Sequence, residues 1–195
     1  MASLEELLKK VAKGKGLVGS GQMARIAEAV TALDYEDLVK AVPEFLPRLV
    51  EVLQARAREI EEIDVKKATG FMLKYLPQII EKMISSDVEI KNELAATEDM
   101  TFNVKAGNIL ETCVRIKGGK ISLSPGLAEE RDFFIDVPTG ELLRIMTAEE
   151  NAMSGLMGGG IAMWREDDEG DMTKSISILP LITVVLEKLG LERLM

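Results

Sequence analysis

The chain has 195 residues, of which 47% are hydrophobic but only 4% aromatic, with no histidine, one cysteine and a formal net charge of −9. The absence of histidine excludes Ser-His-Asp and Cys-His catalysis, and the single cysteine, Cys113, excludes a disulfide framework and a thiolate metal site. The acidic charge argues against nucleic acid as a partner, because phosphate binding is driven by basic surface. The length suits one domain of ordinary size, or one domain with a smaller appendage.

No charged leader followed by an apolar core opens the sequence, and no apolar run approaches the ~20 residues needed to span a bilayer. The longest strongly apolar stretch, Ile178 to Leu186, is about half of that length. We therefore expect a cytoplasmic protein without stable membrane insertion.

From Met1 to about Gly70, every segment with regularly spaced apolar residues has the spacing of a helix. Ser3-Leu4-Glu5-Glu6 is typical of a capping box, and the short helix that it opens is expected to end at Gly14. Ser20 caps a second helix, and Asp34 starts a third that we expect to be broken near Pro43 and Pro47. The apolar positions at helical spacing in these later segments are Met23, Ile26, Ala27, Val30, Leu49, Val50, Leu53, Ile60 and Ile63. Residues 1–70 are thus predicted to form a helical N-terminal unit.

Residues 71–195 are predicted to form a second unit of mixed composition. Two helices, one through Leu76 to Ile84 and one over Val88–Ala96, precede alternating apolar positions typical of strands. The expected strands lie at 102–104, 110–116, 121–123, 133–137 and 161–164, with helices over 139–146 and from 147 to about 157. A last helix, roughly Met172 to Leu189, contains Pro180, so it either kinks or begins there. This order predicts an α+β fold in which a five-stranded, mostly antiparallel sheet is covered by helices on one face.

Two local motifs resemble a cofactor site and a metal site, but the sequence context of each does not fit that function. Gly14-Lys15-Gly16-Leu17-Val18-Gly19 has the spacing of a dinucleotide fingerprint, but a helix precedes it where that motif needs a strand. The acidic run from Glu166 to Asp171 does not fit the calcium-loop consensus and is typical of a solvated turn. We expect no cofactor and no metal.

Methionine and aliphatic residues crowd one segment near the C-terminal end of the chain. They are Met146, Met153, Leu156, Met157, Ile161 and Met163. Because methionine is flexible and apolar, the segment fits either an ordinary core or the soft wall of an apolar ligand cavity. Composition alone leaves both interpretations open.

The order of elements and several local sequences over about residues 71–190 resemble the sterol carrier protein type-two domain. The similarity runs through Leu76-Pro77-Gln78-Ile79-Ile80-Glu81-Lys82-Met83 and through the strands Thr101 to Gly107 and Val114 to Lys120. Its most specific part is Asp136-Val137-Pro138-Thr139, followed by Glu141 to Thr147 and Ala152 to Met163. Residues 1–70 have no counterpart in the isolated family domain.

The resemblance implies a five-stranded sheet whose helices enclose an apolar tunnel for sterols, fatty acids or acyl-CoA. Carried over by position, it implies a tunnel closed by the last helix. The implied ligand-binding residues are Phe102, Phe133, Ile135, Leu142, Met146, Met153, Leu156, Met157, Ile161, Met163, Ile178, Ile182 and Val185. It implies no catalytic residue.

We therefore predict a non-enzymatic binder or carrier of an apolar, lipid-like ligand. The N-terminal helices would gate the tunnel, form a homodimer or contact a partner. One alternative is an interaction or homo-oligomerisation module with a filled core and no ligand. Another is a histidine-free enzyme acting on acyl-CoA, which would need a lysine or glutamate of shifted pKa.

Overall fold

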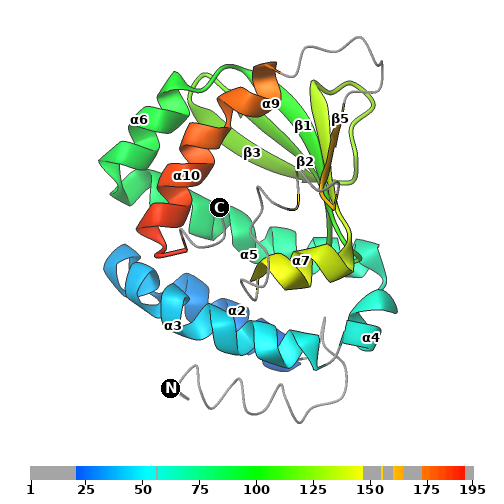
Figure 1. Ribbon diagram of the computed structural model, residues 1–195. Coiled ribbons are helices and arrows are strands. Elements are labelled where there is room, and N and C mark those ends of the chain that lie inside the picture. The colour runs from blue at the N-terminus through cyan, green and yellow to red at the C-terminus, as the bar shows by residue number, and fades with distance from the viewer. Residues whose placement is uncertain (1–20, 56, 147–154, 156–159, 165–172, 192–195) are drawn as a thin grey trace.

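A computed structural model describes residues 21–55, 57–146, 155, 160–164 and 173–191, and Figure 1 shows the arrangement of their helices and strands. The predicted helix at 3–14, the 14–19 glycine motif and the 166–171 acidic run lie outside these residues. The helices are α2 (Gly21–Ala32), α3 (Tyr35–Gln54), α4 (Ala57–Glu61), α5 (Val65–Ser86), α6 (Val88–Ala96), α7 (Thr139–Met146), α9 (Thr173–Ser177) and α10 (Leu179–Lys188). The strands are β1 (Met100–Ala106), β2 (Leu110–Lys117), β3 (Lys120–Pro125), β4 (Phe133–Val137) and β5 (Ala162–Trp164). The predicted α+β class is confirmed.

The strands form one sheet in the order β3-β2-β1-β4-β5. The pairs β1–β2, β2–β3 and β4–β5 are antiparallel, whereas β1 and β4 run parallel. Phe102 of β1 lies opposite both Val114 of β2 and Phe133 of β4, so these three side chains share one face. The rings of Phe102 and Phe133 stack with centroids 4.7 Å apart.

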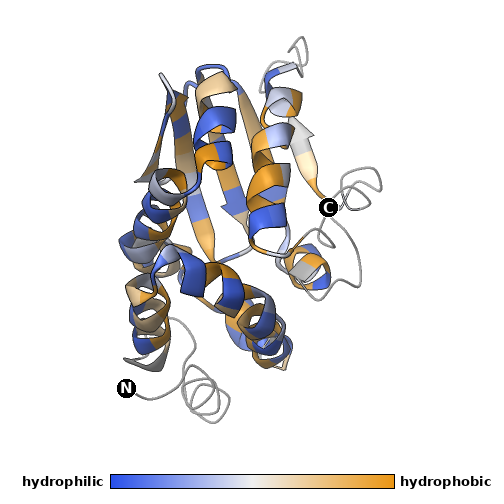
Figure 2. Cartoon of the chain, turned by 90° about the vertical axis from the view of Figure 1, so that its left-hand side faces the viewer, coloured by the Kyte–Doolittle hydropathy of each residue, from blue (hydrophilic) through white to orange (hydrophobic). Residues whose placement is uncertain are grey.

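That face of the sheet is covered by helices, and the main core lies between the two layers. α5 crosses β2 and β3, while α6 and α10 lie side by side over the sheet (Figure 1). Figure 2 shows that the hydrophobic sides of the helices turn toward the sheet and toward one another. The buried core joins Phe102, Val114, Ile116 and Phe133 to residues of the helical layer, which are Leu38, Met83, Ile90, Leu94, Leu181 and Ile178, the residue between α9 and α10.

The expected break in α3 is wrong, because the helix runs without interruption from Tyr35 to Gln54 through Pro43 and Pro47. Two prolines four residues apart lie on the same side of a helix, so the two missing N–H groups are confined to one side. Pro43 packs closely against Gly190. A Cβ added to Gly190 would lie only 3.0 Å from the Cγ of Pro43. The first of the two prolines therefore packs against a residue near the C-terminal end of the chain.

α5 begins earlier than expected and joins the two predicted units. Asp64 caps it by accepting from the backbone N–H groups of Lys66 and Lys67, and the helix continues through Gly70 to Ser86. The boundary expected after residue 70 thus falls inside α5. The ammonium group of Lys82 on α5 donates to the carbonyl oxygens of Thr31, at 2.7 Å, and Leu33, which ties the end of α2 to α5.

The last helical segment is divided at the predicted proline. α9 ends at Ser177, and α10 starts at Leu179 with Pro180 in its first turn, where a missing N–H costs no helical hydrogen bond. Of the two alternatives, a helix that begins at Pro180 is confirmed. No helix in the described part of the chain combines the length and the apolar character needed to cross a membrane.

Candidate functional site

An apolar cavity of about 440 Å³ lies between the N-terminal helices and the rest of the molecule. α2 and α3 form two of its walls, α5 forms another, and α4, α7 and the β1–β2 turn close its sides. From α2 and the turn after it the lining residues are Met23, Ile26, Ala27, Val30 and Leu33; from α3 they are Leu38, Ala41, Val42, Phe45, Leu46, Leu49 and Leu53. The remainder are Ile60 and Ile63 near α4, Ala68, Phe71, Met72, Tyr75, Leu76 and Ile79 of α5, Ala106, Ile109 and Leu110 of the hairpin, and Leu142 of α7.

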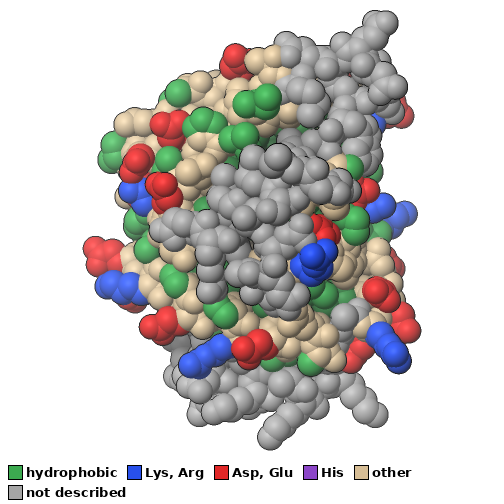
Figure 3. Space-filling model, viewed as in Figure 1, with side chains coloured by type: hydrophobic (Ala, Val, Ile, Leu, Met, Phe, Trp, Pro, Cys, Tyr) green, Lys and Arg blue, Asp and Glu red, His purple; other side chains and the backbone are tan. Residues whose placement is uncertain are grey.

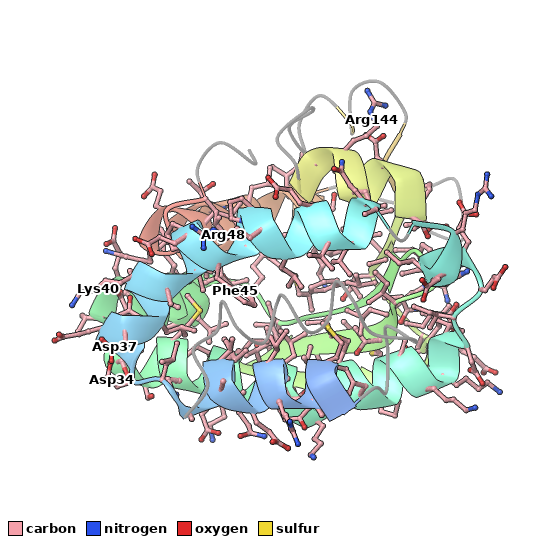
Figure 4. The ribbon with its side chains drawn as sticks, turned by 90° about the horizontal axis from the view of Figure 1, so that it is seen from below. Asp34, Asp37, Lys40, Phe45, Arg48 and Arg144 are labelled. Carbon is pink, nitrogen blue, oxygen red and sulfur yellow. The ribbon has the colours of Figure 1, made fainter. Side chains whose placement is uncertain are left out.

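α3 supplies the longest wall because its lining residues extend from Leu38 to Leu53. Its lining residues recur at spacings of three and four, which places them along one side of the helix. Figure 4 shows Phe45 on the side of α3 that faces α2, while Asp34, Asp37 and Lys40 project away from the cavity at the outer end. The helix therefore separates a hydrocarbon wall from a charged, exposed surface.

The cavity lining carries almost no polar chemistry. Among the described lining residues none is an aspartate, glutamate, lysine or arginine, and the one side-chain hydroxyl is that of Tyr75. That hydroxyl donates to Oε1 of Glu28 at 3.4 Å, and the Tyr75 ring packs against Phe71 with centroids 5.3 Å apart. The tyrosine thus turns its ring to the cavity and its oxygen to a charged neighbour. Such a lining can bury hydrocarbon, but it offers no pair of groups for acid–base chemistry.

Tyr35 and Asp87, whose pKa values are shifted, lie away from the cavity. The pKa of Tyr35 is raised to about 12 by burial and by its hydrogen bond to Asp87. Burial pushes the pKa of Asp87 upward, but hydrogen bonds from Tyr35, Ile90 and Glu89, together with Lys188, outweigh it and leave the pKa below its ordinary value. These groups join α3, α6 and α10 and do not line the cavity. Among the described residues, no group of three or more acidic or cysteine side chains is placed to hold a metal.

The residues implied by the family resemblance are divided between the packed core and the cavity. Leu142 lines the cavity. Phe102, Phe133 and Ile178 are buried in the main core, and Ile135, Ile182 and Val185 pack against it. Ile161 lies in a separate cluster with Ile145 and Leu191. Met153, Leu156 and Met157 lie outside the described residues, as do the side chains of Met146 and Met163.

The N-terminal helices were expected to accompany a site rather than to form one, yet they supply most of the cavity wall. One signal for this was available in the sequence of α3. Two successive helical turns each contain a pair of adjacent apolar residues, first Ala41 and Val42 and then Phe45 and Leu46, so the apolar side of the helix is wide. A helix that packs against one partner needs a narrower stripe. Residues missed in this way include Phe45, Leu46 and Phe71.

Glu141 of α7 is a buried carboxylate next in sequence to the lining residue Leu142. It is 9% exposed, its Oε2 accepts from the guanidinium of Arg144 at 3.3 Å, and its Oε1 accepts no hydrogen bond from the described residues. A Cβ added to Gly155 or Gly160 would lie 2.5 or 2.6 Å from this Oε1. The two glycines therefore leave the space that the carboxylate occupies.

Comparisons with known proteins identify no family for this chain. No family model matches it, and no curated protein matches it. A solved structure that it resembles is a stereoselective inverting sec-alkylsulfatase from Pseudomonas sp., at 13% sequence identity and a TM-score of 0.35. The match covers 96% of this chain and 29% of that one, so this chain spans less than a third of that protein. A similarity at this TM-score defines neither a shared fold nor an activity here.

Proposed function

We propose that this protein binds and carries an apolar, lipid-like molecule in the cavity between α2, α3, α5 and the β1–β2 turn. The observation that carries the proposal is the hydrocarbon lining of a space of about 440 Å³. Ligand pockets commonly measure about 300–1,000 Å³ and are mostly apolar. A lipid tail is the ligand class that needs volume and apolar contact and requires no polar group from the wall.

Burial energetics favour an occupant, because the apolar lining is exposed to water wherever the cavity holds no ligand. A ligand that replaces this water gains about 0.8 kcal/mol for each methylene removed from water.

The resemblance to the sterol carrier protein type-two domain supports the same ligand class by a different route. It implies a tunnel over the sheet, where Phe102, Phe133 and Ile178 pack in the main core. Most of the cavity lining instead comes from residues before position 71, which the isolated family domain lacks. The proposal thus assigns the N-terminal helices to the binding site itself.

The first test is purification of the full chain under native conditions, followed by solvent extraction and mass spectrometry of bound lipid. Ala27 and Ala32 provide a matched pair of positions on α2, because Ala27 lines the cavity and Ala32 is exposed. Ala27→Glu places a carboxylate in the lining and is expected to reduce bound lipid at least ten-fold, whereas Ala32→Glu leaves it unchanged. Absence of bound lipid, together with failure of the delipidated protein to take up fluorescent fatty acid, would refute the proposal.

A second candidate function is self-association through the surface formed by α6, α9 and α10. Val88 and Ile176 are 73% and 61% exposed, and Leu179, Pro180 and Val184 line a shallow groove nearby. Figure 3 shows hydrophobic side chains interspersed over this part of the surface. Sedimentation velocity over a hundred-fold range of concentration tests this candidate, with Ile176→Glu expected to abolish any dimer.

A further inference from the structure

β3 is an edge strand, and its outer side pairs with no other strand among the described residues. It comes first in the order β3-β2-β1-β4-β5. A two-residue turn, Gly118-Gly119, joins it to β2, and the positive φ angles of these glycines, 56° and 69°, are typical of a type I′ turn. The position of this turn determines which backbone groups of β3 point away from β2.

The outward backbone groups belong to every second residue of β3. Lys117 and Lys120 flank the turn, so they exchange backbone hydrogen bonds with each other, and bonded and non-bonded pairs then alternate along the two strands. Ile121 and Leu123 are in non-bonded pairs and turn their N–H and C=O groups outward. Pro125, the next outward position, has no N–H to offer. A strand added to this edge would therefore pair with Ile121 and Leu123.

A groove lies between β3 and the helices α5 and α6. Its apolar lining consists of Pro77, Ile80, Ile84, Leu94, Ile121 and Leu123, and its polar lining of Glu81, Ser85, Lys91, Gly119, Lys120 and Ser122. The side chains of Ile121 and Leu123 pack against the main core, so they lie on the helix-covered face of the sheet. Residues directly opposite each other in neighbouring strands share a face. Every second side chain of an added strand would therefore face this groove.

The other face of the same edge is basic, although the chain as a whole is acidic. Lys120 is exposed on β3, and Arg115 and Lys117 are exposed on the neighbouring β2. None of these three cations forms an ion pair with a residue that the structure describes. The carboxylates closest to them, Asp99 and Asp132, accept hydrogen bonds from other groups. The remaining side chains of an added strand would therefore meet positive charge.

We propose that β3 docks an extended segment of a partner protein in which apolar and acidic residues alternate. The segment would add to the sheet as a further strand, with its backbone bonded to Ile121 and Leu123. Its apolar side chains would enter the groove, and its acidic side chains would lie beside Lys120 on the open face. A second copy of β3 would instead place the cations of two chains on one face, where like charges repel.

The first experiment measures the fluorescence anisotropy of a labelled synthetic peptide in which valine and glutamate alternate, titrated with the full-length protein. We expect this peptide to bind about ten-fold more tightly than one of the same composition with its valines and glutamates in two separate blocks. It should exceed by a similar factor a peptide with lysine in place of glutamate. Failure of the alternating peptide to bind, or equal binding of all three peptides, would overturn the proposal.

N-methylation of the peptide tests the backbone pairing and leaves the protein unaltered. Only every second N–H of an added strand points toward β3. Methylation of that set of alternate nitrogens should abolish binding, whereas methylation of the other set should change the affinity by no more than about two-fold. Equal effects of the two sets would show that the peptide does not bind as a strand, and the proposal would be wrong.

Charge reversal at the edge tests the acidic character of the partner. The double substitution Lys117→Glu and Lys120→Glu, at exposed positions, should weaken binding of the alternating glutamate peptide about ten-fold and strengthen binding of the lysine peptide. Lys66→Glu with Lys67→Glu, exposed at the end of α5 away from the groove, is the matched control and should change neither affinity. Equal losses from the two pairs of substitutions would contradict the proposal.

Two further measurements separate this edge from the other functions. Neither Lys117 nor Lys120 lines the cavity, so uptake of fluorescent fatty acid should be the same in the charge-reversed variant and in the wild type. Sedimentation velocity of the wild type and of Ile121→Pro, which removes an outward N–H, examines pairing between two copies. A wild-type dimer that this substitution dissociates, without binding of the peptide, would assign the edge to a second copy and overturn the proposal.

Discussion

The hydroxyl of Tyr35, the first residue of α3, donates a 2.6 Å hydrogen bond to Oδ2 of Asp87, which caps α6. The other oxygen of Asp87 accepts from the backbone N–H groups of Glu89 and Ile90. Lys188, the last residue of α10, lies 3.9 Å from Asp87 and 2.5 Å from Oε2 of Glu89. One carboxylate thus fastens the longest wall of the cavity to two helices that cover the sheet.

Tyr35→Phe is expected to lower the free energy of unfolding by about 1–2 kcal/mol at pH 7, because it removes a hydrogen bond to a charged acceptor. The effect depends on pH in a defined direction. The pKa of Tyr35 is about 12, above the ordinary 10.0, so its contribution is present below pH 10 and is lost as the pH rises toward 12. The pKa of Asp87 is below the ordinary 3.8, so its contribution is lost as the pH falls below that value.

Urea denaturation of the wild type and of Tyr35→Phe from pH 3 to pH 11 measures this dependence. The stability difference between the two proteins should be constant from about pH 5 to 9 and should shrink above pH 10. A difference that keeps its full size at high pH would show that the phenol–carboxylate bond is not its source.

Lys82→Met tests the attachment of α2 to α5. The ammonium group satisfies the carbonyl oxygens of Thr31 and Leu33, whereas methionine keeps the aliphatic stem without the donor. We expect a loss of about 1–3 kcal/mol in urea denaturation, and weaker lipid binding because Val30 and Leu33 line the cavity. Lys66→Met, at an exposed position on the same helix, should change neither quantity. Equal effects of the two substitutions would contradict the role given to Lys82.

The elements that were predicted well are those whose signal is local. Val88–Ala96 and Thr139–Met146 are helices with the predicted bounds, because a capping aspartate, a preceding proline and apolar spacing all lie within a few residues. The continuity of α3 was not predictable in this way. Its Pro43 packs against Gly190, which is 147 residues away in the sequence, and local spacing gives no information about such a contact.

The cavity was missed for a related reason. Periodicity identified Met23, Ile26 and Val30 as one apolar stripe and Leu49 and Leu53 as another. Whether two such stripes interdigitate or stand apart depends on how the helices are held by distant residues, such as Lys82 and Asp87. Hydrophobic spacing shows that a residue faces inward, but it does not distinguish a filled interior from a hollow one.

Ala41→Leu distinguishes a cavity from a filled core in the protein without ligand. In a close-packed core, a larger side chain forces neighbours apart and costs about 1–3 kcal/mol. At a wall of an apolar cavity the added carbons enter free space, and we expect the delipidated variant to be about 1 kcal/mol more stable than the wild type. Differential scanning calorimetry of the delipidated proteins measures the change. Ala55→Leu, at the exposed C-cap of the same helix, should be neutral, and a destabilised Ala41→Leu would favour the filled-core alternative.

Gly160→Ala tests the packing of the buried Glu141 carboxylate. The added Cβ would lie 2.6 Å from Oε1 and 2.7 Å from Cδ of Glu141, so the carboxylate must move and weaken its ion pair with Arg144. We expect a loss of about 1–3 kcal/mol in urea denaturation. In a Glu141→Ala background the obstruction is gone, so the same substitution should be nearly neutral and the two changes should couple by more than about 1 kcal/mol. Gly140→Ala, where no atom lies within 4 Å of the added carbon, is the control and should be neutral or slightly stabilising. Additive effects of Gly160→Ala and Glu141→Ala would mean that the glycine is required for a reason other than the carboxylate.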